Sequence, residues 1–398
     1  MYAHSTRCDR LLFVRPTVVA VGAILGLLTA SQGFAQVSAR LDCMGLTATI
    51  LGTEGPDVIF GTPGPDIIQG LAGNDVIYGL AGEDRLCGGL GNDYISGGDD
   101  VDTIAGDSIA SFEVAGDDMI DGDDGNDILI GDAVDAGPPP MGDTANRGGD
   151  DTLDGGPGDD AVFGDLLGNS PGDDTIVGGN DHIMGGPGHD FLVGEDNPDF
   201  SGNDVIIGGN DLIEGGEGND RLRGDEMSNG PGSDRITGGN DILYGGPGDD
   251  HLRGDDVDPG TDDLLDVLTG GDDFLSGGPG NDLLEGDWMS GGVGDDRFFG
   301  GDDRLDGGPG EDTLVGDNLI GGAGFDRVIL GSDLLRGGPG NDQLFGDTHD
   351  GVEQVSDGDD QLFGQPGDDH LDCQEGNDIG NGGPGTDTQN ACEVTIGI

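Results

Sequence analysis

The sequence contains no lysine, a single tryptophan and few aromatic side chains of any kind. All 14 basic residues are arginines, against 82 aspartates and glutamates, so the formal net charge is −68. Nucleic acids and anionic membranes would repel such a chain, and we expect neither as a partner. Apolar residues make up only 33% of the sequence, too few to stabilise an ordinary globular domain of this charge.

Histidine and cysteine clusters, which zinc and copper prefer, are also lacking, and aspartate is the main acidic residue. Carboxylate oxygens without soft ligands suit calcium. The composition therefore indicates that this chain binds several calcium ions.

The first 35 residues differ from the rest. Arg7, Arg10 and Arg15 precede the apolar run Thr17–Ala30, and small residues stand before Gln36. This order is typical of a secretory signal peptide, and the run is too short for a membrane span of about 20 residues. We expect a secreted, extracellular protein, free or at the cell surface. Cleavage removes three arginines and one aspartate and brings the net charge to −70.

Five cysteines become four when Cys8 leaves with the signal peptide. Because an exported protein lies in an oxidising compartment, we expect local disulfides that join Cys43 to Cys87 and Cys373 to Cys392.

A nine-residue unit, G-G-x-G-x-D-x-(aliphatic)-x, recurs along the chain, and such self-similarity predicts a repeat architecture. Residues 155–184, 185–214 and 215–244 form a longer period of 30 residues, each built from segments of 9, 14 and 7 residues. The middle segment is a longer one that opens with Gly-Asp or Gly-Glu. Complete GGxGxD turns begin at Gly88, Gly155, Gly185, Gly215, Gly245, Gly277, Gly291, Gly307, Gly321, Gly337 and Gly382.

These periods divide the chain into six segments. They are a signal peptide (1–35), an N-terminal cap (36–51), a first repeat array (52–130), a loop or linker (131–149), a second array with the 30-residue period (150–390) and a C-terminal cap (391–398).

The last three residues of each nonapeptide predict a short strand whose central side chain points inward. Two facing stacks of such side chains would form a narrow aliphatic core. These residues are Ile77, Ile95, Val162, Ile183, Leu192, Leu222, Leu252, Leu284, Leu314 and Leu344.

Burial of this thin core alone does not offset the conformational entropy lost by so many glycines. Stacked turns also bring aspartates into rows, which repel one another unless a cation lies between them. Calcium, with six to eight oxygen ligands from carboxylates and backbone carbonyls, supplies the missing stabilisation.

The nonapeptide Gly185–Val193, GGPGHDFLV, resembles the RTX (hemolysin-type) calcium-binding repeat. The resemblance extends over nearly all of the chain after about residue 52 and implies an all-β fold, a parallel β-roll or β-solenoid. In that family the sixth-position aspartate and the turn carbonyls bind calcium between successive turns. The implied metal ligands are Asp93, Asp160, Asp190, Asp220, Asp250, Asp282, Asp296, Asp312, Asp326, Asp342 and Asp387.

Two features depart from the simple family pattern. Seven-residue units such as GGNDHIM (178–184) lack the second half of the turn, so we expect weaker calcium binding at Asp181, Asp211 and Asp241. The 30-residue unit also exceeds the 18 residues of a two-strand turn. It fits either one and a half turns of a roll or one turn of a three-sided helix.

We therefore expect a non-enzymatic protein that folds on binding several calcium ions and has a structural or surface-interaction role. The alternatives are the scaffold of a secreted hydrolase or protease, and an adhesin. Arg223-Gly224-Asp225 and Arg253-Gly254-Asp255 spell an integrin-binding tripeptide, but a repeat that places Arg before Gly-Asp explains both copies.

Overall fold

The fold, taken from a computed structural model, is described for most of the chain after residue 41. The described residues are 42–110, 115–135, 145–168, 173, 175–197, 203–228, 232–258, 265–290, 296–320, 327–350, 354–392 and 394–396. The predicted signal peptide and Cys8 lie outside them. All regular elements in these ranges are β-strands, and none of them is a helix that could cross a membrane.

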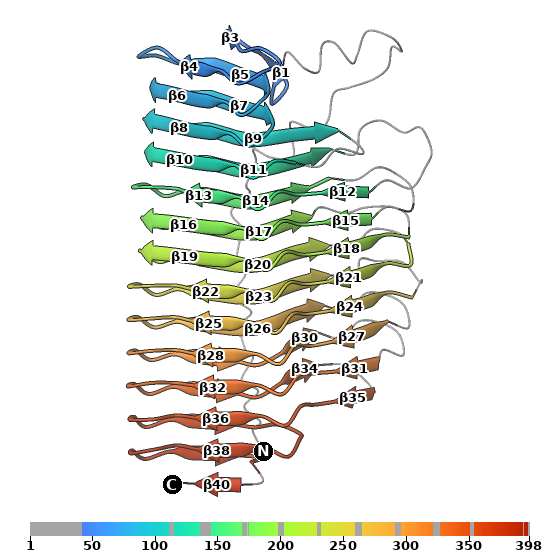
Figure 1. Cartoon of the computed structure of the whole chain (residues 1–398). Helices are drawn as coiled ribbons and strands as arrows, with labels where there is room; N and C mark the ends of the chain where they lie inside the picture. Colours follow the sequence, from blue (N-terminus) through green and yellow to red (C-terminus); the bar gives the residue numbers. More distant parts are fainter. Residues whose placement is uncertain are drawn as a thin grey trace, which may run out of the picture.

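The chain forms an all-β solenoid whose strands stack in parallel, which confirms the predicted fold class (Figure 1). Within each sheet a strand pairs with its neighbours one turn earlier and one turn later, except at the two ends, and among the described strands only the β1–β2 hairpin is antiparallel. Glycines in the turns permit this close stacking of one turn directly upon the next.

In the described part of the chain, three stacked sheets make up the solenoid, and a small hairpin of β1 (Asp42–Cys43) and β2 (Leu46–Thr47) precedes them. The first sheet contains β4 (Val58–Phe60), β6 (Val76–Ala81), β8 (Tyr94–Asp99), β10 (Met119–Asp124), β13 (Thr152–Asp154), β16 (His182–Pro187), β19 (Leu212–Glu217), β22 (Ile242–Tyr244), β25 (Phe274–Ser276), β28 (Arg304–Asp306), β32 (Leu334–Arg336), β36 (Gln361–Phe363), β38 (Ile379–Asn381) and β40 (Val394–Ile396).

The second sheet contains β3 (Ile50–Leu51), β5 (Ile67–Ala72), β7 (Arg85–Leu90), β9 (Thr103–Ala110), β11 (Ile128–Asp135), β14 (Ala161–Leu167), β17 (Phe191–Asn197), β20 (Arg221–Ser228), β23 (His251–Asp258), β26 (Leu283–Ser290), β29 (Thr313–Val315), β33 (Gln343–Phe345), β37 (His370–Asp372) and β39 (Thr388–Asn390). In the same sheet, β30 (Asn318–Ile320) pairs with β26, and β34 (Thr348–Asp350) pairs with β30. The third sheet contains β12 (Ala145–Arg147), β15 (Thr175–Val177), β18 (Val205–Ile207), β21 (Arg235–Thr237), β24 (Val267–Thr269), β27 (Arg297–Phe299), β31 (Arg327–Ile329) and β35 (Gln354–Ser356).

The number of sides changes along the stack, and the 30-residue unit is one turn of a three-sided helix, not one and a half turns of a roll. Near the N-terminal end, equivalent residues lie 18 residues apart and the solenoid has two sides. In the middle they lie 30 residues apart, and the third sheet makes a three-sided helix. The spacing returns to 18 residues after β36, where two sides remain.

Residues 131–149, for which the sequence predicts a loop or linker, contain the end of β11 and all of β12. The ladder of paired strands continues across this segment, because β10 pairs with β13 and β11 pairs with β14. Residues 136–144 lie outside the described part of the chain. The third sheet thus begins inside the segment, and the two repeat arrays form one stack.

The aliphatic core follows the predicted inward positions. All ten residues predicted to point inward are fully buried in one continuous cluster between the first and second sheets. A second cluster lies between the second and third sheets and includes Ile206, Met227 and Phe298. Neither core is more than a few side chains wide, as the repeat length dictates.

Both predicted disulfides are present, Cys43–Cys87 and Cys373–Cys392. The first joins β1 to β7, and the second joins the residue after β37 to a residue after β39. Each terminal region that the sequence assigns to a cap also adds a strand to the stack, since β3 pairs with β5 and β40 pairs with β38.

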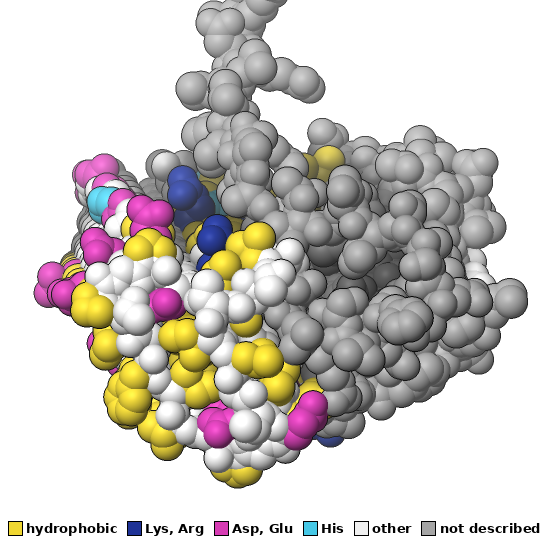
Figure 2. All heavy atoms as spheres, turned by 90° about the horizontal axis from the view of Figure 1, so that it is seen from above, with side chains coloured by type: hydrophobic (Ala, Val, Ile, Leu, Met, Phe, Trp, Pro, Cys, Tyr) yellow, Lys and Arg dark blue, Asp and Glu magenta, His cyan; other side chains and the backbone are white. Residues whose placement is uncertain are grey.

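Figure 2 views the solenoid along its axis, with the turn of β3 and β4 at the near end. Hydrophobic side chains are exposed there, among them Leu51, Val58 and Phe60.

Candidate metal centres

Most strands of the second sheet are preceded by an aspartate that occupies the sixth position of its turn. The backbone N–H of Asp160 donates a hydrogen bond to Oδ1 of Asp190 (2.8 Å), and that of Asp190 donates to Oδ1 of Asp220 (2.9 Å). We call this row the first ladder. It comprises Asp66, Asp84, Asp102, Asp127, Asp160, Asp190, Asp220, Asp250, Asp282, Asp312, Asp342, Asp369 and Asp387.

Two further ladders use the same hydrogen bond. The second ladder precedes the strands of the first sheet, and the third ladder precedes those of the third sheet. The second contains Asp57, Asp75, Asp93, Asp118, Asp151, Asp181, Asp211, Asp241, Asp273, Asp303, Asp333, Asp360 and Asp378. The third contains Asp204, Asp234, Asp266 and Asp296.

The other carboxylate oxygen of the first ladder faces an oxygen-lined space. Oδ2 of Asp190 is buried and has no hydrogen-bond partner among the described residues. A Cβ added to Gly185 would lie 2.6 Å from this Oδ2 and 2.6 Å from the carbonyl oxygen of Gly215. A carboxylate and a carbonyl from successive turns therefore converge on a space that a side chain does not fill, and these are ligands that calcium prefers.

Burial also makes the free carboxylates of the first ladder costly. It raises the pKa of Asp190 to about 7, and that of Asp160 and Asp250 to about 6. The hydrogen bond from the preceding turn lowers each pKa, but by less than burial raises it. A cation is the partner that would keep these groups ionised at neutral pH.

A fourth row of acidic residues was not identified from the sequence. Each member is fully buried and directly follows a glycine that lies in, or just after, a strand of the second sheet. We call these residues the inner row. They are Asp107, Asp132, Asp165, Glu195, Asp225, Asp255, Asp287, Asp317 and Asp347.

The inner row reaches the turns that precede the first sheet. The N–H of Gly179 donates to Oδ2 of Asp165 (2.7 Å), that of Gly209 to Oε1 of Glu195 (2.9 Å), and that of Gly239 to Oδ2 of Asp225 (2.7 Å). These glycines belong to the truncated seven-residue units. A side chain from the second sheet therefore enters the truncated turn.

The inner row and the second ladder together form groups of three carboxylates. In Asp165, Asp181 and Glu195, one oxygen from each residue lies within 4.8 Å of the others, and the same holds for Asp225, Asp241 and Asp255. Eight such groups of three or more potential metal ligands occur in the described residues. Burial and the neighbouring carboxylates raise the pKa of Asp181 and Asp241 well above 3.8.

The structure distributes the predicted metal ligands over all three ladders. Eight of them, namely Asp160, Asp190, Asp220, Asp250, Asp282, Asp312, Asp342 and Asp387, lie in the first ladder. Asp93 lies in the second ladder and Asp296 in the third, both of them buried. Asp326 lies outside the described residues.

We expected weaker calcium binding at Asp181, Asp211 and Asp241 because their turns lack the second half of the motif, and the structure removes this reason. Their turns are indeed short, but Asp165, Glu195 and Asp225 of the inner row occupy the space of the missing half. The one signal in the sequence was the recurrent Gly-Asp or Gly-Glu of the middle segment.

The integrin-type tripeptides are products of the repeat, as the sequence predicts. Asp225 and Asp255 are fully buried members of the inner row, so neither carboxylate is available to a receptor.

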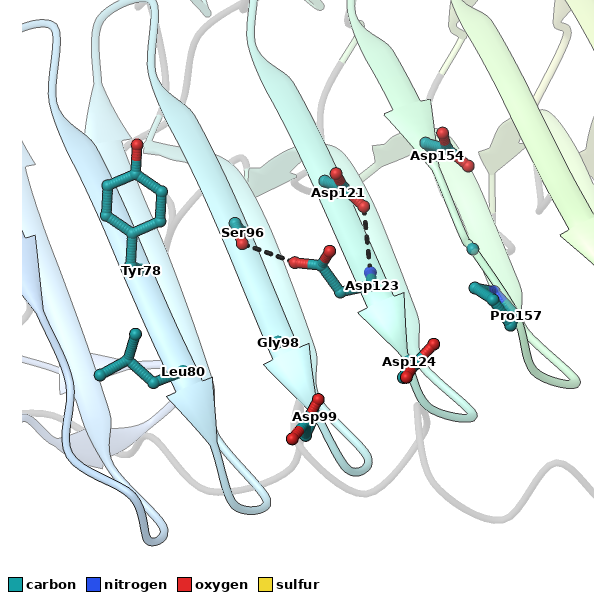
Figure 3. A pocket seen from close by; sticks show the side chains of 11 residues that line it. Tyr78, Leu80, Ser96, Gly98, Asp99, Asp121, Asp123, Asp124, Asp154 and Pro157 are labelled. Carbon is teal, nitrogen blue, oxygen red and sulfur yellow. Dashed lines mark hydrogen bonds between the residues drawn. The ribbon is translucent and has the colours of Figure 1, made fainter.

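A shallow acidic groove lies on the outer face of the first sheet (Figure 3). The hydroxyl of Ser96 donates to Oδ2 of Asp123 (2.6 Å), and the N–H of Asp123 donates to Oδ1 of Asp121 (3.0 Å). Tyr78 at one end of the groove also stacks on Phe60, with ring centroids 5.1 Å apart. Acidic and aromatic side chains thus share this surface.

A comparison with known proteins covers most of the segments that contain these rows. A family model described as RTX calcium-binding nonapeptide repeat (4 copies) matches more than half of the chain. The matched residues are 51–86, 81–108, 115–135, 147–166, 170–209, 200–226, 229–258, 267–288, 285–314, 300–318, 329–350 and 355–389. No curated protein matches the chain significantly.

Proposed function

Because the chain belongs to the family of RTX calcium-binding nonapeptide repeat proteins, we propose that it is a secreted calcium-binding β-solenoid that, at neutral pH, folds only when calcium fills its turns. The proposal adds to family membership a dependence of folding on calcium, export from the cell and a biological role. The observation that carries it is the row of buried carboxylate oxygens in the first ladder that have no described hydrogen-bond partner.

Stacking makes these carboxylates a problem for the metal-free chain. Neighbouring strands of a sheet lie about 4.8 Å apart, so each ladder places like charges at about that spacing. Ionised carboxylates at this distance, shielded from water, repel one another strongly. Calcium between successive turns replaces this repulsion with attraction, and its binding energy becomes folding energy.

Folding as a function of calcium, measured at about pH 8 where the buried carboxyls are ionised, tests the proposal. With chelator, the mature chain should be expanded and give little β signal in circular dichroism. With millimolar calcium it should become compact and rich in β structure, as seen by circular dichroism and small-angle scattering. A chelated chain that is already compact and β-rich would contradict the proposal.

Magnesium is the control that distinguishes coordination of calcium from simple screening of the negative charge. It prefers rigid octahedral geometry and releases its waters reluctantly, whereas the ladder sites offer carbonyls and carboxylates on adjacent turns. Magnesium at the same concentration should therefore not fold the chain. Equal folding in both salts would attribute the effect to screening of the net charge.

The location proposed for the protein is extracellular. Two disulfides support it, because such bonds persist in oxidising compartments, and the predicted signal peptide supports it as well. Mass spectrometry of the exported protein would test this, with an N-terminus at Gln36 as the expected result.

We propose a structural or surface-interaction role without catalysis. The segments between matched repeats are each far shorter than a domain, which leaves little chain after residue 51 for a separate catalytic unit. The acidic groove and the aromatic pair Phe60–Tyr78 support an interaction role, and they favour an adhesin over an enzyme scaffold as the second candidate.

A further inference from the structure

We propose that a continuous row of calcium ions, one for each turn, runs between the inner row and the second ladder of the three-sided part of the solenoid. These ions are distinct from those in the complete nonapeptide turns, because each is held by three carboxylates, none of which belongs to a complete GGxGxD motif. The inference rests on the proposed calcium binding and extends it to a second class of site.

The three-carboxylate groups overlap in a regular way. Asp165 belongs both to the group of Asp151 and to that of Asp181, Glu195 to the groups of Asp181 and Asp211, and Asp225 to those of Asp211 and Asp241. Each inner-row residue is thus shared by two successive groups, whereas each second-ladder aspartate belongs to one. An ion in every group would be linked to the next ion by a bridging carboxylate.

Sharing fixes the charge of each group. Each turn contributes one inner-row carboxylate and one second-ladder carboxylate, which carry two negative charges when ionised. One divalent cation per turn neutralises them. A row of sites with a bridging carboxylate at every step is therefore charge-balanced along its whole length.

Each group also presents carboxylate oxygens that lack a partner. Oδ1 of Asp165, Oδ2 of Asp181 and Oε2 of Glu195 are buried, with no hydrogen-bond partner in the described part of the chain. The three side chains are at most 2% exposed. Buried carboxylates without partners are strongly destabilising, and a cation at their centre satisfies all three.

A backbone carbonyl adds to the carboxylates. A Cβ placed on Gly164 would collide with Oδ2 of Asp181 and would lie 2.7 Å from the carbonyl oxygen of Gly194. Glycine therefore keeps open the space beside this oxygen pair. The donor set contains only oxygen atoms, as calcium requires.

The position of the row in the fold excludes water from it. On β20, buried Leu222 belongs to the core between the first two sheets, and buried Met227 belongs to the core next to the third sheet. Asp225 lies between them along the strand. The expected spacing of the ions is the strand spacing of about 4.8 Å, wider than the 3.5–4 Å of carboxylate-bridged two-metal sites.

Counting bound calcium in charge-matched variants of the mature chain tests the row. Asp225→Asn removes a bridging carboxylate that serves two groups, and Asp241→Asn removes one that serves a single group. We expect the first variant to lose two calcium ions and the second to lose one, measured by equilibrium dialysis and atomic emission. Asp272→Asn is the control, because Asp272 is exposed in the same turn as Asp273, and Asn240 occupies the equivalent position one turn earlier. It should lose none.

A fourth variant separates failure of this inference from failure of the proposed function. Asp250→Asn alters the first ladder only and should lose calcium at a complete nonapeptide turn. If Asp250→Asn loses ions while folded Asp225→Asn and Asp241→Asn keep the full count, the row is wrong and its carboxyls are protonated. If the unmodified chain binds no calcium, the proposed function itself fails.

Should Asp225→Asn not fold, the unmodified protein still decides the question. Anomalous difference maps from crystals grown with calcium should show one peak per turn beside Asp181, Asp211 and Asp241. Peaks confined to the complete nonapeptide turns would overturn the inference.

Discussion

The sixth-position aspartate has two tasks, and only a carboxylate on a short side chain performs both. Oδ1 of Asp190 accepts the N–H of Asp160 and fixes the register between two turns, while Oδ2 remains directed at the oxygen-lined space beside Gly185. Asparagine would offer one oxygen in place of two and no charge. The longer glutamate would shift both oxygens away from these positions.

The fourth-position glycine allows a substitution test with a matched control. A Cβ on Gly188 would collide with the carbonyl oxygen of Gly158 in the turn before it, whereas a Cβ on Gly64, the same motif position, meets no described atom within 4 Å. Gly188→Ala should therefore destabilise the calcium-loaded protein by more than about 1 kcal/mol. Gly64→Ala should be nearly neutral. Urea unfolding at saturating calcium measures both, and equal stability of the two variants would contradict the assigned turn packing.

The strands are too short to be stable alone, and the ends of the stack lack a neighbour on one side. The disulfide Cys373–Cys392 crosslinks the last turn, and a closed loop of about this size contributes about 3 kcal/mol in the chain-entropy model. Replacing both cysteines by serine should abolish hydrogen-exchange protection in β37–β40 and leave β17–β20 unchanged. Loss of protection throughout the stack would show that the bond stabilises more than the end of the solenoid.

The sequence predicted the strands and the first ladder because both repeat at a fixed, short period. Leu192 and Asp190 stand at constant positions in the nonapeptide, so their burial follows from the motif. The sequence did not predict the third sheet, because a 30-residue unit has the right length both for one and a half turns of a two-sided roll and for one turn of a three-sided helix. The inner row was missed because Glu195 lies 14 residues from Asp181, and only the path of the chain around three sides brings them together.

Repetition also determines how damage spreads through the whole molecule. In a solenoid, stability is approximately a sum of local terms and nearest-neighbour interfaces. Asp190→Ala should therefore weaken calcium-induced folding and expose the strands of its own turn and of the adjacent turns, leaving distant turns protected. Hydrogen exchange mapped along the chain at saturating calcium measures this spread. Global unfolding at the same calcium concentration would show that the stack folds as one indivisible unit.

The stability of the whole molecule depends on pH because its buried carboxyls gain or lose protons. Burial raises the pKa of Asp190 to about 7 and that of Asp160 to about 6, from ordinary values of 3.8. A carboxyl with a raised pKa in the folded state keeps its proton there after the unfolded chain has lost it. The metal-free fold is therefore favoured at about pH 4 and below, and it loses stability as the pH rises through about 6 to 7.

Calcium reverses this dependence, because it binds the ionised carboxylates and must displace their protons. In chelator, β structure measured by circular dichroism should be greatest near pH 4 and disappear by about pH 8. The calcium concentration needed for half-maximal folding should instead rise as the pH falls from about 8 to 5. These opposite slopes follow only if the same buried carboxyls hold either a proton or a calcium ion. A chelated chain that gains β structure with rising pH, or a calcium requirement independent of pH, would exclude them as the ligands.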